Sequence, residues 1–323
     1  MSIINWGIIG CGDVTEFKSG PALNKVPGSA LVAVMRRNAD KAADYAKRHN
    51  VSRWYSDAAK LINDTEVNAI YIATPPSSHE EYTLAAINAG KPVYVEKPMA
   101  LNYASAKRMA EAATAKNIKL VVAHYRREWP MFKKIKELLN EKAIGEVQNI
   151  KLEFERPPLT KEDLLDEKKA WRVNPAISGG GLFHDLAPHQ LDIMYWLFGG
   201  TEKITGHSSN RGGHYAADDT VNGYIEFANG IQFNGYWNFN AAGSKDLCKI
   251  NGSKGKLAFN FFETPVIEIT TDGNTERLSF ESLQHVQQPM IERVVQYFLG
   301  NEANPCSGEE GVEVMRWMES FIN

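Results

Sequence analysis

A pair of glycines that directly follows an apolar segment near the N-terminus restricts the fold of this chain more than any other feature. Residues 3–9, IINWGII, are predicted to form a strand covered on both faces. In the loop GCGDVT at 10–15, Gly10 permits a tight turn and Gly12 lets the backbone approach a pyrophosphate, which the next helix N-terminus favours. The third glycine position holds Thr15, which predicts slightly looser helix–strand packing. The loop predicts dinucleotide binding; the alternative is an ordinary glycine turn in an α/β protein that binds something else.

Strands and helices then alternate through residue 124. Short apolar runs predict further strands at 31–35, 69–73, 93–95 and 120–123. Helical spacing of apolar residues predicts helices that start after Asn38 and that span 80–89 and 104–115. This alternation is typical of a doubly wound parallel sheet, a Rossmann domain.

The pattern changes after Pro130. A helix at 132–140 is followed by long alternating segments that predict strands at 147–155, 220–227, 231–239, 247–250, 257–261 and 266–271. Asn229-Gly230 and Asp272-Gly273 favour tight hairpins between strands. One helix, 187–198, interrupts the strands, and two helices, 289–299 and 309–321, close the chain. The predicted fold class is therefore α/β with a C-terminal α+β domain on a large, open, mostly antiparallel sheet. We divide the chain into 1–124 and 125–323, and leave open that the helix at 309–321 packs back on the first domain.

Charge and composition exclude several classes of partner. The 323 residues carry a formal net charge of −3, which gives no electrostatic basis for binding nucleic acid or an anionic membrane. No apolar stretch reaches the length of a membrane span, and the N-terminus does not resemble a signal peptide. Cys11, Cys248 and Cys306 are widely spaced, which favours a reducing cytoplasm. His207, His214 and His285 show no metal-ligand spacing, so no metal is predicted.

The residues after the second strand bear on the choice of dinucleotide. Folds that prefer NAD place an acidic residue there to hold the ribose 2′-hydroxyl, and this chain has Arg36, followed by Arg37. A guanidinium can pair with a 2′-phosphate through two hydrogen bonds. NADP is therefore predicted as the preferred coenzyme, with NAD as the alternative; the competing interpretation is that both arginines are simply solvated.

Three further motifs permit a family comparison. They are Thr74-Pro75-Pro76 with His79, Glu96-Lys97-Pro98, and the run from Gly179-Gly180-Gly181 through Asp185 and His189 to Asp192. In this order and with the glycine loop, they resemble the glucose–fructose oxidoreductase / inositol dehydrogenase / MocA family over nearly the whole chain. The resemblance implies a Rossmann domain followed by an open-sheet domain, and a nicotinamide that faces a pocket lined by the helix after the triple glycine.

The same resemblance assigns roles to individual residues. Lys97 matches the family's catalytic or orienting lysine, and Asp185 and His189 match the Asp and His of the glycine-rich motif. The Thr-Pro-Pro turn is implied at the cofactor, and Arg126, Trp171 and Arg172 near the nicotinamide or substrate. The cofactor-binding residues expected on these grounds are Gly10, Cys11, Gly12, Asp13, Val14, Arg36, Arg37, Thr74, Pro75, Pro76, His79, Glu96, Lys97, Arg126, Trp171 and Arg172. The expected substrate-binding residues are Lys97, Trp171, Arg172, Asp185 and His189.

The chemistry of alcohol oxidation agrees with these residue types. A hydride leaves carbon for the nicotinamide while a proton leaves the hydroxyl, and histidine is suited to take that proton. We assign His189 as acid/base, Lys97 as electrostatic and proton-relay partner, and Asp185, four residues before His189, as the residue that orients it. The roles of Lys97 and His189 are interchangeable on this reasoning. Asp192 is expected to make supporting or interdomain contacts, and His184 to be structural. The alternatives are that Lys97 is a surface lysine before a proline turn and His189 a core histidine, that Asp185 caps the helix start with Pro188 in its first turn, and that Trp171 and Arg172 only pack between domains.

The expected function is an NAD(P)-dependent dehydrogenase or reductase of a sugar, inositol or related polyol. Two alternatives remain from the sequence: a nicotinamide-dependent glycosidase without net redox change, and a non-catalytic regulator that senses the dinucleotide. The substrate itself is not indicated by any motif. By resemblance, the open sheet predicts a homodimer or homotetramer.

Overall fold

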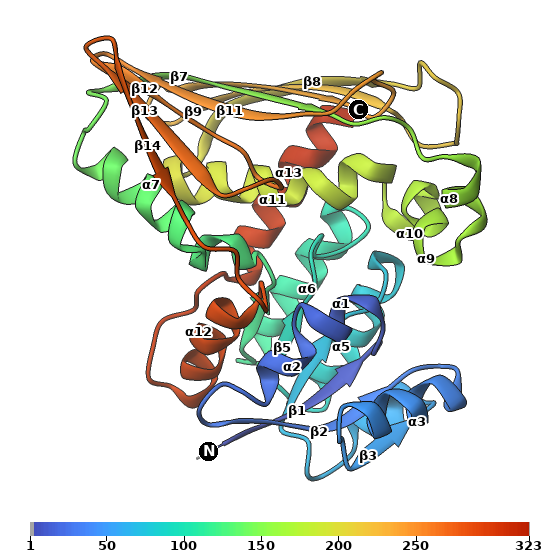
Figure 1. The fold of residues 1–323 in the computed structure, drawn as a ribbon. Helices are drawn as coiled ribbons and strands as arrows, with labels where there is room; N and C mark the ends of the chain where they lie inside the picture. The colour runs from blue at the N-terminus through green and yellow to red at the C-terminus, as the bar shows by residue number, and fades with distance from the viewer. Residues whose placement is uncertain (1–2, 323) are drawn as a thin grey trace. The chain divides into compact units, whose positions relative to one another are not determined.

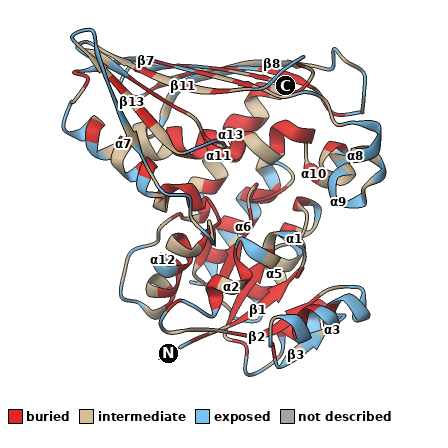
Figure 2. Ribbon diagram, in the orientation of Figure 1, coloured by how far each residue is buried: buried red, intermediate tan, exposed pale blue. Residues whose placement is uncertain are grey.

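The computed structural model describes residues 3–322, which divide into two compact units (Figure 1). The first unit comprises residues 1–126 and 283–315, and the second comprises 127–282 and 316–323. The predicted division at 124/125 therefore needs one correction, because residues 283–315 belong with the N-terminal sheet. Each unit has its own sheet and its own apolar core, as Figure 2 shows by the buried strands.

The first unit is built on a six-stranded sheet in the order β3-β2-β1-β4-β5-β6, and all of its strand pairs are parallel. The strands are β1 Ile4–Ile9, β2 Ser29–Met35, β3 Arg53–Tyr55, β4 Ala69–Ile72, β5 Val93–Val95 and β6 Leu120–Val122. The predicted doubly wound sheet is confirmed. The short edge strand β3 was missed because three residues, one exposed and two partly exposed, give no periodic signal.

Helices connect these strands, and polar side chains fix where several of them begin. They are α1 Asp13–Phe17, α2 Gly20–Leu23, α3 Ala39–Arg48, α4 Ala58–Ile62, η1 Pro76–Ser78, α5 His79–Asn88, α6 Tyr103–Ala115 and η2 Tyr125–Glu128. The side chain of Asn38 accepts a hydrogen bond from the Lys41 N–H at 2.9 Å, and Asn102 does the same for Ser105. These caps satisfy amides that lack a partner in the first helical turn.

The chain returns to the first unit after the second sheet is complete. Residues 283–315 contribute α12, Gln288–Leu299, and the first half of α13, Gly308–Ile322. The Val122 N–H donates to the Cys306 carbonyl at 3.0 Å beside the edge strand β6. Phe298 packs its ring against the buried Trp6, with centroids 5.5 Å apart. These contacts join residues far apart in the chain, which is why a division by local pattern misses them.

The second unit contains an eight-stranded sheet in the order β14-β13-β12-β11-β7-β10-β9-β8. The strands are β7 Val147–Glu155, β8 Thr201–Ser209, β9 Thr220–Phe227, β10 Gln232–Asn238, β11 Lys245–Gly252, β12 Gly255–Phe259, β13 Val266–Thr271 and β14 Asn274–Ser279. Only the β7–β10 pair is parallel, which confirms the predicted mostly antiparallel sheet. Both edge strands, β8 and β14, were missed, because each has only one large apolar residue, Ile204 in β8 and Leu278 in β14, and so gives no apolar alternation.

Helices cover one face of this sheet and leave the other open (Figure 1). On β10, Phe233 and Trp237 are buried, whereas Gln232 and Asn234, on either side of Phe233, are exposed. The helices of this unit are α7 Pro130–Asn140, α8 Lys161–Leu165, α9 Glu167–Ala170, η3 Trp171–Val173, α10 Pro175–Ser178 and α11 Gly181–Phe198. Every residue of α8 and α9 is at least partly exposed, as Figure 2 shows.

Helix α11 begins six residues before its predicted start. Gly181 is its first residue, and the Gly181 N–H donates to Ser178 Oγ at 3.0 Å. Asp185 and Pro188 therefore lie inside the helix, and the alternative in which Asp185 caps its start is wrong. A proline inside a helix removes one backbone hydrogen bond and crowds the carbonyl four residues earlier, and the buried apolar residues of α11 offset that cost.

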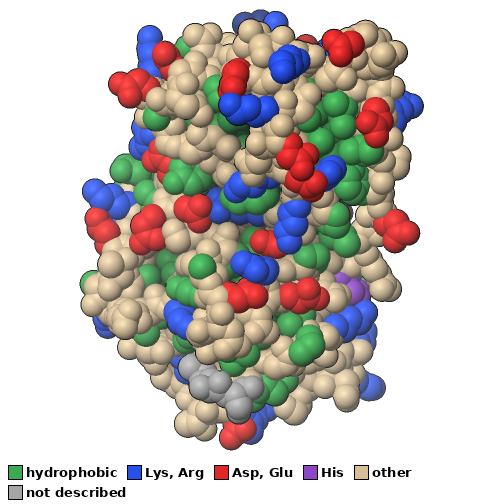
Figure 3. Space-filling view, turned by 90° about the vertical axis from the view of Figure 1, so that its left-hand side faces the viewer, with side chains coloured by type: hydrophobic (Ala, Val, Ile, Leu, Met, Phe, Trp, Pro, Cys, Tyr) green, Lys and Arg blue, Asp and Glu red, His purple; other side chains and the backbone are tan. Residues whose placement is uncertain are grey.

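The part of the chain that the structure describes meets the requirements of neither a membrane-spanning helix nor a metal site of three or more side chains. Across residues 3–322, no helix is both long and apolar enough to cross a membrane. Nor does that stretch gather three His, Cys, Asp or Glu side chains in a geometry that could hold a metal ion. On the face of the molecule in Figure 3, Lys and Arg side chains are interspersed with Asp and Glu.

Candidate active site

The glycine loop connects β1 to α1 at the carboxyl edge of the first sheet. Gly10 has φ +94°, and a Cβ there would lie 2.7 Å from Thr74 Cγ2 and 2.9 Å from the Ala73 carbonyl carbon. Glycine at position 10 is therefore required by the backbone angle and by the packing of the turn against Ala73 and Thr74. At Gly12 the nearest neighbour of a Cβ would be the Gly10 oxygen at 3.8 Å. The space above Gly12 is therefore open, as close approach of a pyrophosphate requires.

Thr15 does not loosen the packing, contrary to the prediction. The residue is fully buried, its hydroxyl donates to the Gly12 carbonyl at 2.8 Å, and its own carbonyl accepts from Tyr45 Oη at 2.8 Å. A separate close approach lies between α1 and α2, where a Cβ on Gly20 would be 2.2 Å from the Thr15 oxygen. Thr15 is thus accommodated by burial and by its two hydrogen bonds.

Arg36 lies beside this loop. Its Nη1 is 3.4 Å from the Cys11 carbonyl, and its backbone N–H donates to Tyr55. Arg37 is exposed. The Arg36 guanidinium is therefore next to the glycine turn, where a residue at the end of β2 meets the ribose in dinucleotide folds.

The Thr-Pro-Pro turn and the Glu-Lys-Pro turn follow β4 and β5 and are bridged by one histidine. His79 is fully buried, with Nε2 2.7 Å from the Thr74 carbonyl and Nδ1 3.0 Å from the Pro98 carbonyl. Burial lowers the pKa of His79 below its usual value. Both ring nitrogens thus face backbone carbonyls, and the imidazole joins the two turns; its predicted contact with the cofactor stays a prediction.

Glu96 directs its carboxylate into the protein. It is 5% exposed, and its Oε1 accepts from Tyr71 Oη and Gln287 Nε2, both at 2.5 Å. Neither partner could be predicted from the sequence, because Tyr71 has the pattern of a core strand residue and Gln287 is 191 positions away from Glu96. These contacts all lie within the protein, so the predicted cofactor role of Glu96 stays a prediction.

In the second unit, Asp185 and His189 lie one helical turn apart on α11. Asp185 Oδ2 is 3.0 Å from Arg172 Nε, and the Arg172 guanidinium lies 4.8 Å from the centre of the Trp171 ring. His189 is 5% exposed, with its ring centroid 5.7 Å from that of Phe262 in an edge-to-face arrangement. The structure thus brings together four of the five predicted substrate residues and pairs Asp185 with Arg172.

Asp192, the next residue along this helical face, forms a buried ion pair. Arg127 Nη2 and Nε lie 2.7 Å and 3.0 Å from its carboxylate oxygens, and both side chains are about 98–99% buried. Arg126 is also buried, with its guanidinium 5.7 Å from the centre of the Tyr125 ring. His184 is buried, and burial lowers its pKa to about 4, so the ring is neutral, as expected for a structural residue.

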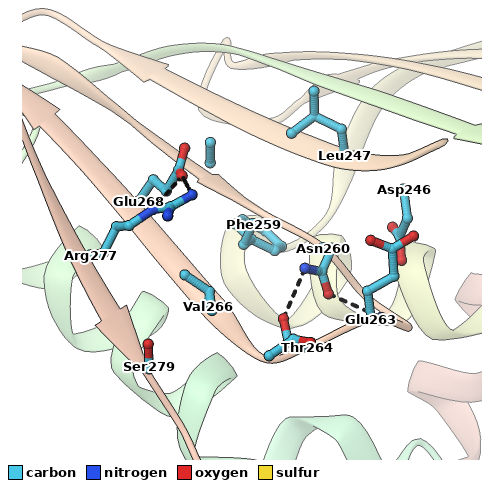
Figure 4. A pocket seen from close by; sticks show the side chains of 11 residues that line it. Asp246, Leu247, Phe259, Asn260, Glu263, Thr264, Val266, Glu268, Arg277 and Ser279 are labelled. Carbon is cyan, nitrogen blue, oxygen red and sulfur yellow. Dashed lines mark hydrogen bonds and ion pairs between the residues drawn. The ribbon is translucent and has the colours of Figure 1, made fainter.

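A shallow pocket of about 340 Å³ on the second sheet contains none of the motif residues (Figure 4). Its lining includes Leu247, Val266 and the Glu268–Arg277 ion pair, which Figure 4 shows on neighbouring strands. Asp246 at its edge accepts hydrogen bonds from the Phe261 and Phe262 N–H groups. The Asp246 carboxylate therefore stabilises the local backbone, and the pocket is not the candidate active site.

A parallel sheet with an open glycine turn at its carboxyl edge is the architecture of a dinucleotide-binding domain. Two family models match: the NAD-binding Rossmann domain of the oxidoreductase family over residues 4–124, and the C-terminal domain of the same family over 132–258. The chain belongs to the Gfo/Idh/MocA family of NAD(P)-dependent oxidoreductases, which confirms the resemblance.

Individual relatives agree with this assignment. The chain is 49% identical to Oxidoreductase P35 of Formosa agariphila, over 99% of this chain and 98% of that protein. It is 26% identical to a 1,5-anhydro-D-fructose reductase of Ensifer adhaerens, over 78% of this chain and 74% of that protein. A structure of levoglucosan dehydrogenase in complex with NADH and levoglucosan shares the fold, with a TM-score of 0.87 at 21% identity, over 98% of this chain and 95% of that one.

The open space at Gly12 predicts the effect of one added methyl group. Gly12 has extended backbone angles that alanine adopts without strain, so Gly12→Ala should fold with an unchanged melting temperature. The methyl would occupy the path of the pyrophosphate, and a clash of about 1–3 kcal/mol weakens coenzyme binding roughly tenfold to hundredfold. Calorimetric titration with NADP⁺ and NAD⁺ measures this. Undiminished affinity for both coenzymes would show that the loop does not face the dinucleotide.

Proposed function

We propose that this protein transfers a hydride between nicotinamide C4 and a carbinol or carbonyl carbon of a sugar, inositol or related polyol. The observation that carries the proposal is Lys97, which lies two residues after β5 at the same carboxyl edge as the glycine loop. The relatives support the substrate class, since one acts on an anhydro-sugar by name and a protein of the same fold binds levoglucosan.

The residues fit a bound dinucleotide. The Gly10–Val14 loop would hold the pyrophosphate, Arg36 would contact the adenosine ribose, and the turns at 74–76 and 96–98 would flank the nicotinamide half. When bound, the coenzyme accepts or donates the hydride. The protein's part is to orient the polyol and move its hydroxyl proton.

His189 and Lys97 are proposed to divide the proton transfer. The His189 imidazole takes the proton from the substrate hydroxyl, and the Lys97 ammonium stabilises the negative charge that develops on that oxygen. Asp185 orients the substrate or the imidazole, and its pairing with Arg172 keeps both side chains in fixed positions. The opposite division, with Lys97 as the proton acceptor, uses the same residues.

An assay for coenzyme absorbance tests this function. The purified protein is incubated with NADP⁺ or NAD⁺ and a panel of aldoses, inositols and anhydro-sugars, and with the reduced coenzymes and the matching ketones. We expect turnover with at least one polyol. Tight coenzyme binding without turnover of any member in either direction would contradict the proposal, and cleavage of an aryl glycoside without net absorbance change would replace it with the glycosidase reaction.

We also propose that NADP is the preferred coenzyme, supported by Arg36 beside the glycine loop. Arg36→Asp should weaken NADP⁺ binding about tenfold to hundredfold, because it removes a charged hydrogen bond of about 1.5–3 kcal/mol and adds a charge that repels the 2′-phosphate. NAD⁺ affinity should stay the same or improve. Arg37→Asp is the matched control on the exposed neighbouring arginine. A wild-type protein that binds NAD⁺ more tightly, or a switch caused by Arg37→Asp alone, would refute the assignment.

We also propose a cytoplasmic location and a homo-oligomeric state. Cys11, Cys248 and Cys306 are free and buried, which supports action in a reducing cytoplasm. The open face of the second sheet supports a homodimer or homotetramer, which light scattering coupled to gel filtration measures.

A further inference from the structure

A buried chain of hydrogen bonds surrounds the carboxylate that directly precedes Lys97. Glu96 Oε1 accepts from Tyr71 Oη on β4 and from Gln287 Nε2, each at 2.5 Å, and Glu96 Oε2 accepts from the Lys97 N–H at 3.2 Å. Tyr94 Oη donates to Gln287 Oε1 at 2.9 Å, and Tyr71 Oη lies 2.9 Å from Ser19 Oγ. All of these residues belong to the first unit. Tyr71 and Gln287 thus hold one oxygen of the Glu96 carboxylate, and the other oxygen contacts the Lys97 backbone.

The donors to this carboxylate are neutral. Burial raises the pKa values of Tyr71 and Tyr94 well above 10, so both phenols keep their protons at working pH. The amide of Gln287 and the backbone N–H of Lys97 do not titrate. Hydrogen bonds to a buried carboxylate are strong and directional, so each donor restricts where the carboxylate sits.

Gln287 has the geometry of a dedicated linker. It is 1% exposed, its N–H donates to the Lys18 carbonyl at 3.2 Å, and its side chain joins Tyr94 to Glu96. On the other side of Lys97, the Pro98 carbonyl is 3.0 Å from His79 Nδ1. The backbone that carries Lys97 is therefore held at the residue before it and at the residue after it. An error of about 1 Å in a group that meets the substrate can cost a hundredfold in rate.

We propose that Gln287 is a positioning residue for Lys97, acting through the Glu96 carboxylate. Residues 283–287 thereby complete the catalytic edge of the first sheet from a point about 190 residues downstream. This inference rests on the proposed function, in which Lys97 meets the substrate oxygen.

The variant Gln287→Glu tests it with almost no change in shape. While protonated, the introduced acid can still donate one hydrogen bond to Glu96 and accept from Tyr94. At lower pH the two neighbouring carboxyl groups share one proton. At higher pH that proton is lost and the two carboxylates repel each other. Besides this pair, the titratable groups next to Glu96 are Tyr71, Tyr94, Lys97 and His79. The ratio of variant to wild-type kcat should be near one at pH 5.5 and fall about tenfold to hundredfold by pH 8.5, with the coenzyme Kd within about twofold.

Gln288→Glu is the matched control, because the Gln288 side chain donates to Glu292, one turn further along α12, in a solvent-exposed hydrogen bond. Its kcat ratio should stay flat with pH. Tyr94→Phe removes the bond that orients the Gln287 amide and should lower kcat in the same direction, which keeps the test available if Gln287→Glu folds poorly.

Two further measurements distinguish a positioning role of Gln287 from an effect on stability. They also distinguish a failure of this inference from a failure of the proposed function. In a Lys97→Met background, Gln287→Glu should leave the residual turnover unchanged, since a residue that acts through Lys97 has nothing left to act on. Competitive acetylation of Lys97, read by mass spectrometry, should change with Gln287→Glu and not with Gln288→Glu, whether or not a substrate is known. If Lys97→Met abolishes turnover while Gln287→Glu follows the wild type across pH and leaves Lys97 labelling unchanged, the inference fails and the proposed function stands. If Lys97→Met has no effect on turnover, the proposed function fails instead.

Discussion

Replacing Lys97 by methionine is expected to lower kcat for polyol oxidation about 10²–10⁴-fold, the range for loss of one acid/base or charge-stabilising group. Methionine keeps the length and apolar stem of lysine but removes the ammonium. Because Lys97 follows the buried strand β5 and its backbone is held by Glu96 and by His79 through Pro98, the substitution should leave the turn in place. Coenzyme affinity should therefore change little while turnover is lost.

Stopped-flow and steady-state assays measure kcat, and calorimetry measures the coenzyme Kd. Lys116→Met serves as the control, since Lys116 is exposed at the end of α6. His189→Ala should lower kcat by a similar factor if the two residues share the proton transfer. Wild-type turnover in both Lys97→Met and His189→Ala would remove the basis of the mechanism.

Removing the carboxylate of Asp192 is expected to lower the free energy of unfolding by about 3–5 kcal/mol, the range for breaking a buried ion pair from one side. Arg127 is 2% exposed and holds Asp192 through two nitrogens. In Asp192→Leu the guanidinium would remain buried without the carboxylate that offsets its desolvation. Since Asp192 lies on α11 with Asp185 and His189, the loss should also raise the mobility of the helix that carries them.

Urea unfolding followed by tryptophan fluorescence gives the free energy. The double variant Arg127→Met/Asp192→Leu should recover much of the loss, because it removes both buried charges. Glu153→Ala, which breaks the exposed pair with Lys245, should cost less than about 1 kcal/mol. A cost for Asp192→Leu no larger than that of Glu153→Ala would show that the buried pair is not essential to the second unit.

The amino-acid sequence by itself determined the class of the protein and most of its machinery. The glycine loop, the alternation of apolar strands and amphipathic helices, and the three ordered motifs are local patterns. Each depends on the conformation of a few neighbouring residues, such as the positive φ of Gly10 or the helical spacing of Asp185 and His189. These patterns located the loop, Arg36, Lys97 and the motif helix before any contact was known.

Tertiary structure alone decided what depends on residues distant in the chain. The edge strands β8 and β14 exist because a neighbouring strand pairs with them, and their own sequences carry little periodicity. Gln287 meets Glu96 only because residues 283–315 return to the first sheet. Asp192 finds Arg127 across 65 positions. Such pairings are selected by burial of the whole core, and a free energy shared among many distant contacts leaves no local signature in the chain.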